Sequence, residues 1–393
     1  MNAKVKQFLF LVAVALFWFS QYVYTSYFTP YMTSLGIAAS LAGTIVGAYG
    51  FTQLVLRIPF GVAADFLKNH RLFLFLGYIF IVIASTVLML SQSAGIFLLA
   101  RLLSGAASST WVSFTLYFSA FSSGSNASGD MGKLMAANNL GVFIAYITGG
   151  LLFEAVGIRM LFVLSGAVAA MSIVLLLFLR PDGTQIERRP LKLSDLGLVI
   201  KDGHLWNLSL LAAAIQFITC ATASSFTSNY AKSLGADGLQ LGIVSALYTL
   251  SGVIGASLIS TRFSRRFSDR VIVILGFILT LIYCAGVPLC RTVPPLYVIQ
   301  FIGGFGKVLV MTLLMADAVK DAAPAVRSTA MGVYQSVYGL GMTVGPIVMG
   351  AILEKTDGFG PAFFFMAGAS LVCAVWAFFS RYDAKIKPVP SEK

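Results

Sequence analysis

The chain has 393 residues, of which 58% are hydrophobic and only 11% are charged, and its net charge is +12. Soluble proteins average about 25% charged residues, so this composition excludes a water-soluble enzyme and predicts an integral membrane protein. The positive charge does not indicate nucleic-acid binding, because the basic residues lie in short segments between apolar stretches. We expect no nucleic-acid partner, and we expect the lipid bilayer to surround the chain.

Twelve apolar segments are each long enough to cross about 30 Å of hydrocarbon as a helix. In the first half of the chain they are residues 7–33, 38–63, 72–90, 95–118, 133–153 and 159–179. In the second half they are residues 205–228, 239–261, 271–290, 294–318, 328–353 and 360–380. The first segment lacks a small-residue cleavage site, so we expect a retained span and not a signal peptide. The predicted fold class is an all-α integral membrane protein with twelve transmembrane helices.

The two halves of the chain repeat each other at an offset of 199 residues, which becomes 200 near residue 131. Matched pairs include Tyr31 and Tyr230, Tyr49 and Tyr248, Arg71 and Arg270, Gly105 and Gly304, and Met131 and Met331. We therefore predict an N-terminal six-helix bundle (1–180), a cytoplasmic linker (181–204), a C-terminal six-helix bundle (205–380) and a cytoplasmic tail (381–393). Membrane proteins built from two parallel repeats usually hold their substrate between them.

The distribution of basic residues predicts the orientation of the chain. Of the 27 Lys and Arg residues, 20 lie in loops on one side, four lie in loops on the other and three lie within spans. Basic loops stay in the cytoplasm, so both termini are predicted to be cytoplasmic, in a prokaryotic inner membrane. The four cysteines all fall inside apolar spans, where we interpret them as packing residues that form neither a disulfide framework nor a metal site.

Two spans and one loop carry recognisable motifs. The loop after the second span holds Gly61, then Asp65 four residues later, and ends on Arg71. The fourth span reads Arg101-Leu-Leu-Ser-Gly105, and the eleventh reads Gly341-Met-Thr-Val-Gly345-Pro346. With two sets of six spans and a basic central loop, the whole chain resembles the major facilitator superfamily, and in particular its bacterial exporters.

That resemblance implies two pseudo-symmetric six-helix bundles, no cofactor, and gating residues at the motif positions: Asp65, Gly61, Arg71, Gly345 and Pro346. The chain departs from the family pattern in two places. The family loop typically reads G-x-x-x-D-R-x-G-R-R, but Phe66 stands where the Arg after Asp is expected. Family antiporters usually carry Gly-Pro in span five, where this chain has Ala145-Tyr146. The second departure weakens an inference of drug:proton antiport.

The resemblance also implies that spans one, four, seven and ten line a central cavity. Lys307 lies about 13 residues from the outer end of span ten, which places it near the middle of the membrane. A charged residue at that depth faces protein or water. Together with Arg57 on span two, the polar and aromatic residues of the cavity spans are predicted to bind substrate: Lys307, Arg101, Tyr24, Tyr27, Gln21, Ser108, Trp111, Gln216 and Gln300. For two of them an alternative stays open, since Arg57 could be a gate or snorkelling residue and Arg101 a structural hydrogen-bond hub.

Acidic residues are missing from the middle of every predicted span. Glu154 and Asp317, which lie near span ends, are the candidates for proton coupling. A cavity that carries bases and no carboxylate favours an anionic solute over a cationic drug. The leading prediction is therefore a monomeric secondary active transporter that exports a small anionic or amphipathic metabolite by alternating access.

Three alternatives remain open at this point. A proton-coupled multidrug exporter would require Glu154, Asp317 or Asp65 to titrate during turnover, which makes protons a possible coupling ion. A membrane sensor would bind its ligand without moving it, and a lipid flippase would need a lateral opening beside the aromatic spans. An enzyme is not expected, because no span holds a nucleophile and base pair or a cluster of metal ligands.

Overall fold

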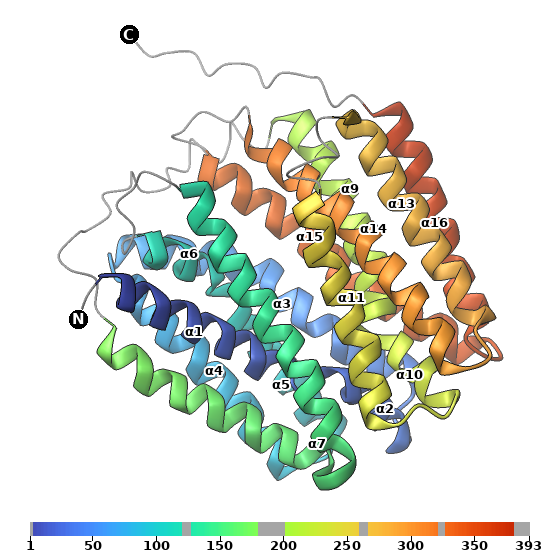
Figure 1. Cartoon of the computed structure of the whole chain (residues 1–393), viewed down its shortest axis with the longest axis horizontal. Helices are drawn as coiled ribbons and strands as arrows, with labels where there is room; N and C mark the ends of the chain where they lie inside the picture. Colours follow the sequence, from blue (N-terminus) through green and yellow to red (C-terminus); the bar gives the residue numbers. More distant parts are fainter. Residues whose placement is uncertain (1–2, 120–126, 180–200, 259–265, 321–326, 381–393) are drawn as a thin grey trace.

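The computed structural model describes residues 3–119, 127–179, 201–258, 266–320 and 327–380, and within these ranges every regular element is a helix (Figure 1). The first half contains α1 (Ala3–Tyr22), α2 (Thr25–Ser34), α3 (Ala39–Phe66), α4 (His70–Leu90), α5 (Ala94–Ser109), α6 (Trp111–Ser119) and α7 (Ala127–Phe178). The second half contains α9 (Gly203–Ala221), the π-helical turn η1 (Thr222–Phe226), α10 (Thr227–Ser233), α11 (Gly238–Leu258), α13 (Asp269–Gly286), the 3-10 turn η3 (Val287–Leu289), α14 (Val293–Lys320), α15 (Arg327–Lys355) and α16 (Gly360–Phe379).

Eleven helical stretches of the described residues are long and apolar enough to cross a membrane. One of them, Met131–Phe178, has 48 residues, which is about 72 Å of helix and more than twice the thickness of the hydrocarbon core. Gly157 interrupts it with a left-handed φ of 71°, and Figure 1 shows the chain reversing its direction there. When the two arms of α7 are counted separately, the eleven stretches of the described residues become twelve helical segments, and the sequence predicts twelve spans.

Glycine makes several of the tight reversals possible. Gly36 and Gly235, at equivalent positions of the two repeats, have φ values of 77° and 87°, and Gly358 has 81°. A side chain is strained in this region of backbone space, whereas glycine enters it freely. We call the end of the molecule that holds these reversals the far end; it contains the turns at residues 35–38, 91–93, 157, 234–237, 290–292 and 356–359. The opposite end, where α1 begins and α16 ends, is the termini end.

The helices pack as two sets. In the first half α1 packs on α7, and α4 packs on both α5 and α7; in the second half α13 packs on α14 and α16, and α9 packs on α15. The two sets meet along α3 with α15 and along α7 with α11. This arrangement agrees with the predicted all-α architecture. The linker prediction falls mostly on residues 181–200, and the tail prediction falls on residues 381–393, which lie outside the described residues.

The two halves share one hydrophobic core at the far end and have separate cores at the termini end. The shared core includes Phe28 and Phe162 from the first half with Phe226 and Met366 from the second. Toward the termini end, one core is built from the second half alone, and the other comes from the first half except for Ala246. The halves are therefore joined at the far end and diverge toward the termini end.

The spacing between α3 and α15 also increases from the far end to the termini end. A Cβ atom added at Gly43, near the far end, would lie 2.1 Å from the carbonyl oxygen of Pro346. A Cβ atom added at Gly332, near the termini end, would lie 4.0 Å from the nearest atom of Ile58. Glycine at position 43 permits backbone contact that a side chain would block. The seam between the halves is consequently tight at the far end and looser at the termini end.

Candidate functional site

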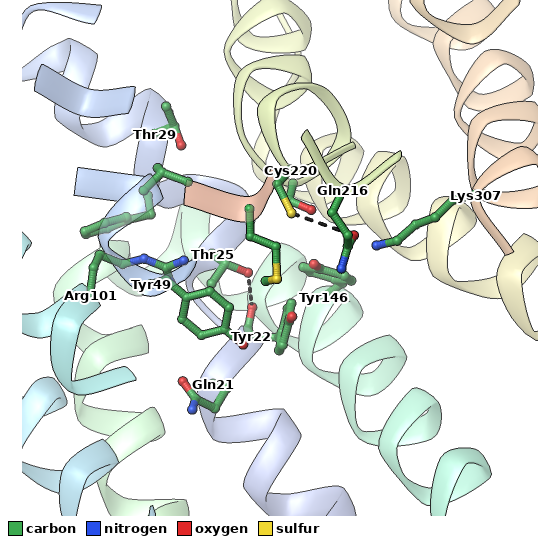
Figure 2. A pocket seen from close by; sticks show the side chains of 14 residues that line it. Gln21, Tyr22, Thr25, Thr29, Tyr49, Arg101, Tyr146, Gln216, Cys220 and Lys307 are labelled. Atoms are coloured by element: carbon green, nitrogen blue, oxygen red, sulfur yellow. Dashed lines mark hydrogen bonds between the residues drawn. The ribbon is translucent and has the colours of Figure 1, made fainter. Parts of the chain in front are cut away.

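A cavity lies between the two halves, and side chains from both halves line it (Figure 2). Its volume is about 130 Å³, and since one water needs roughly 10–15 Å³ by this measure, the space is sufficient for a small organic molecule. Its lining residues are Gln21, Tyr22, Thr25, Phe28, Thr29, Val46, Tyr49, Arg101, Tyr146, Gln216, Cys220, Ser224, Lys307 and Met342. None of these side chains is acidic.

The first span of each half is interrupted beside this cavity. Between α1 and α2 the helix breaks after Tyr22, whose carbonyl oxygen accepts a hydrogen bond from Thr25 Oγ1 at 2.9 Å. In the second half the π-helical turn η1 follows Ala221, and Ser225 Oγ within it donates to the carbonyl oxygen of Cys220 at 2.7 Å. Hydroxyl side chains that bond to the backbone in this way compete with regular helix hydrogen bonds. Sequence periodicity predicted continuous helices here, and these local bonds are the physical reason for the difference.

Two cations, Arg101 and Lys307, face each other across the cavity (Figure 2). The guanidinium of Arg101 lies over the ring of Tyr49, with Cζ 4.6 Å from the centroid, and its buried Nε has no hydrogen-bond partner within the described chain. Lys307 Nζ lies 5.9 Å from the centroid of Tyr248. Neither cation pairs with an acidic side chain in the described ranges. A cation–π contact contributes about 0.5–2 kcal/mol, which is less than the several kcal/mol of desolvation that a buried charge must offset.

A hydrogen-bond network beneath the cavity holds the wall of the first half. Gln21 Nε2 donates to the carbonyl oxygen of Ser104 at 3.0 Å and to Ser108 Oγ at 3.1 Å. Ser108 Oγ also lies 2.8 Å from the hydroxyl of Tyr49. This network fixes the ring against which Arg101 lies. Ser108 is fully buried, so its effect on the cavity passes through Gln21 and Tyr49.

The structure brings four of the ten predicted substrate residues to the cavity wall: Gln21, Arg101, Gln216 and Lys307. The other six lie elsewhere. Tyr24 packs on Phe162, and Trp111 packs on Trp18, both within the first half. Gln300 is fully buried, and neither its Oε1 nor its Nε2 has a hydrogen-bond partner among the described residues.

Arg57 and Tyr27 lie on the seam between the halves. Arg57 NH1 donates to the hydroxyl of Tyr338 on α15 at 2.8 Å, and its NH2 group contacts Gln53. At the far end, the hydroxyl of Tyr27 donates to the carbonyl oxygen of Gly238 at 3.2 Å. Both residues thus contact the opposite half of the chain, and neither lines the cavity.

The two proton-coupling candidates also lie away from the cavity. Glu154 Oε1 accepts a hydrogen bond from the backbone N–H of Gly238 at 2.7 Å, which links α7 to the first turn of α11 at the far end. Asp317 is buried in the last third of α14. A role for Glu154 in coupling would therefore act on the contact between the halves and not on the solute itself.

The predicted gating residues occupy different kinds of position. No atom lies within 4 Å of a Cβ added at Gly61, and the side chain of Asp65 lies outside the described residues. A Cβ at Gly345 would lie 2.0 Å from the carbonyl oxygen of Phe217, so this glycine allows α15 to contact α9 within the second half. Pro346, its neighbour, presents its carbonyl oxygen to Gly43 of the first half.

Arg71 has a repeat partner with the same contact. Arg71 NH2 donates to the carbonyl oxygens of Leu176 and Leu177 at 3.1 and 3.0 Å, near the end of α7. Arg270 NH2 donates to the carbonyl oxygen of Ser380 at 2.9 Å, directly after α16. The last carbonyl groups of a helix lack intrahelical partners, and basic side chains satisfy them. Each arginine thus fastens the sixth span of its half to the third.

We expect Arg71→Ala and Arg270→Ala each to reduce the free energy of unfolding by about 1–2 kcal/mol, since a charged donor to a carbonyl is worth about 1.5–3 kcal/mol before solvent screening. Thermal unfolding in detergent should show a loss of a few degrees for each variant and an additive loss for the double variant. A change of transport rate in Arg71→Ala that Arg270→Ala does not share would instead indicate a gating role for Arg71.

Sequence reasoning missed several lining residues, among them Tyr22, Thr25, Tyr49, Tyr146 and Cys220. It interpreted Cys220 as a packing residue, whereas the thiol lies on the cavity wall. The repeat pairing of Tyr49 with Tyr248 was the available signal, because each ring lies beside a cation of the cavity wall. The two cations are on the predicted spans four and ten.

Comparison with known proteins agrees with this architecture. The family model described as Major Facilitator Superfamily matches residues 10–229 and 210–393. The chain belongs to the major facilitator superfamily. It is 24% identical over 363 residues to the inner membrane transport protein YajR of Escherichia coli (strain K12), a match that covers 88% of this chain and 77% of YajR.

Two further similarities extend the comparison. A multi-drug resistance efflux pump PmrA homolog of Lactococcus lactis subsp. lactis (strain IL1403) is 26% identical over 233 residues, which cover 56% of each chain. The crystal structure of a mutant of the nucleoside transporter NupG superposes with a TM-score of 0.82 at 14% identity, covering 96% of this chain and 99% of that one. At that identity the likeness establishes the fold alone. The protein is thus a multi-pass membrane protein of the facilitator superfamily, whose members transport small solutes and are generally not enzymes.

Proposed function

We propose that this facilitator exports a small organic anion from the cytoplasm by alternating access, and that Arg101 and Lys307 bind the anion. The observation that carries the proposal is the pair of cations on opposite walls of a cavity whose lining contains no carboxylate. A charge-assisted hydrogen bond from either cation to a carboxylate or phosphate is roughly twice as strong as a neutral one. An anion therefore satisfies groups that the described residues leave without an acidic partner.

The proposed direction follows from the membrane potential and from the orientation that the basic loops predict. With both termini in the cytoplasm, the termini end faces the cytoplasm, and the halves diverge toward that side. A potential that is negative inside drives an anion outward by about 2.3 kcal/mol per charge per 100 mV. Export of an anion needs no coupled ion, whereas its uptake would need one.

The proton-coupled multidrug exporter is the second candidate, and the similarity to the Lactococcus lactis efflux pump homolog favours it. Such an exporter commonly uses an acidic group that titrates as the solute is exchanged. Glu154 would have to act through its bond to Gly238, and Asp317 through the termini end of α14, because neither side chain lines the cavity. This candidate predicts that cations bind the cavity better than anions of the same shape.

Cys220 offers a direct test, because it is the cysteine that lines the cavity between the two cations. In a variant with Cys284, Cys290 and Cys373 replaced by alanine, we expect a sulfonate-bearing methanethiosulfonate to modify Cys220 at least tenfold faster than a trimethylammonium-bearing one. The local positive potential attracts the anionic reagent. Rates are measured by mass spectrometry on the purified protein at low and high salt.

The control is Lys320→Met, which removes a cation from the exposed end of the same helix, α14. It should leave the ratio of the two rates unchanged, whereas Lys307→Met and Arg101→Met should each reduce the ratio. If the cationic reagent modifies Cys220 faster in the protein that keeps both Lys307 and Arg101, the result would contradict anion binding and would favour the multidrug candidate.

A further inference from the structure

The repeat relates the two cation sites in an unexpected way. Gly105 and Gly304 are equivalent, and a Cβ on either would clash with the carbonyl oxygen of the equivalent tyrosine, Tyr49 at 2.4 Å or Tyr248 at 2.1 Å. The repeat thus holds at atomic detail around these tyrosines. Each half presents one tyrosine ring and one cation beside it. The cavity is built from two half-sites of the same design.

The cations themselves do not occupy equivalent positions. The residue equivalent to Arg101 is Gln300, and the residue equivalent to Lys307 is Ser108. Lys307 therefore lies seven residues further along its helix, which is about 10 Å nearer the termini end. The two side chains nevertheless bring their charges to opposite walls of the same cavity, each beside its tyrosine ring, while aromatic and apolar side chains such as Tyr22, Tyr146 and Met342 lie on the wall with them.

Charge balance decides what kind of anion suits this arrangement. When the termini end closes over a bound solute, both cations lose contact with water, and an uncompensated buried charge is strongly destabilising. A monoanion neutralises one cation and leaves the other without a counter-charge. A solute with two separated anionic groups neutralises both.

We propose that the solute is an elongated dianion, with one acidic group bound by Arg101, the other bound by Lys307, and a short apolar body between them. This inference rests on the proposed anion transport and adds the number and the separation of the charges. The second acidic group gives selectivity, since a solute that lacks it leaves a buried cation unpaired in the closed state.

Protection of Cys220 from methanethiosulfonate modification tests the inference on the full chain with Cys220 as its single cysteine. The probes are α,ω-dicarboxylates with one to eight methylene groups, the monomethyl ester of each, and the α,ω-diamines of the same lengths. We expect at least one dicarboxylate to protect at a concentration at least tenfold lower than its own monomethyl ester. Lys307→Met and Arg101→Met should each reduce that difference to about twofold, and Lys307→Arg should preserve it.

The outcomes separate the two levels of the proposal. Equal protection by the dicarboxylates and their monoesters, both better than the diamines, would leave anion transport standing and overturn the dianion. Stronger protection by the diamines would overturn both. Failure of every dicarboxylate in the series to protect would also overturn the dianion. In Lys320→Met the dicarboxylates should protect Cys220 as well as they do in the protein without that substitution. This control excludes a general effect of lost positive charge.

Discussion

Replacement of Lys307 by methionine is expected to reduce potential-driven efflux of an organic anion about 10- to 100-fold. The substitution removes a charge-assisted hydrogen bond worth about 1.5–3 kcal/mol while it keeps the length of the side chain, and each 1.4 kcal/mol is tenfold in affinity. Labelled organic anions and lipophilic cations are loaded into proteoliposomes, and a membrane potential and a pH gradient are imposed separately. Efflux is measured at solute concentrations below saturation.

The matched control for this experiment is Lys320→Met, which should transport at the rate of the unsubstituted protein. If cations move instead, and follow only the pH gradient, the cationic cavity is not the substrate site. The coupling group must then be sought at Glu154, Asp317 and Asp65.

Replacement of Gly43 by leucine should change the conformation of the protein without unfolding it. A Cβ at this position meets the carbonyl oxygen of Pro346 across the seam between the halves, so the clash is relieved when the far end opens. Overpacking of a close contact costs about 1–3 kcal/mol, which is enough to reverse the populations of two states of similar energy. Cys220 modification by an impermeant reagent should become at least tenfold slower from the termini side and correspondingly faster from the far side.

Gly141 provides the comparison, because its Cβ would lie 2.1 Å from the carbonyl oxygen of Ala15 within the first half. Separation of the halves does not relieve that clash. Gly141→Leu should therefore lower the thermal stability and leave the sidedness of Cys220 modification unchanged. If Gly43→Leu loses stability as Gly141→Leu does, and its sidedness stays the same, then position 43 is not part of a moving contact.

The fold could be predicted from the sequence because it follows from two patterns that extend over long stretches of the chain. Apolar segments of sufficient length give the helices, and the repeat at 199 residues gives the division into halves. The repeat also pairs Gly36 with Gly235, whose left-handed turns end equivalent helices. Boundaries within the spans could not be predicted, because hydroxyl side chains such as Thr25 and Ser225 bond to the backbone locally.

The candidate site could be predicted only in part, and span one shows why. The sequence places Tyr24 and Tyr27 on a polar stripe that assumes an unbroken helix. The break after Tyr22 rotates the following residues, so that Thr25 lines the cavity while Tyr24 packs inside the first half. On spans four and ten no break precedes the cations, and the helical spacing places Arg101 and Lys307 correctly on the cavity wall. Which groups on the opposite half each side chain meets depends on tertiary packing that the sequence does not show.

The interruptions in the first span of each half have a mechanical consequence. Beyond them lie only α2, with 10 residues, and α10, with seven, and these short helices touch through Asn229 Nδ2 and Thr33 Oγ1 at 3.0 Å. A helix bends most easily where its hydrogen-bond ladder is already broken. The breaks lie beside the cavity, so α2 and α10 can tilt there while the longer helices α1 and α9 keep their positions. The export proposed above then needs only these two short helices to move apart for the cavity to open at the far end.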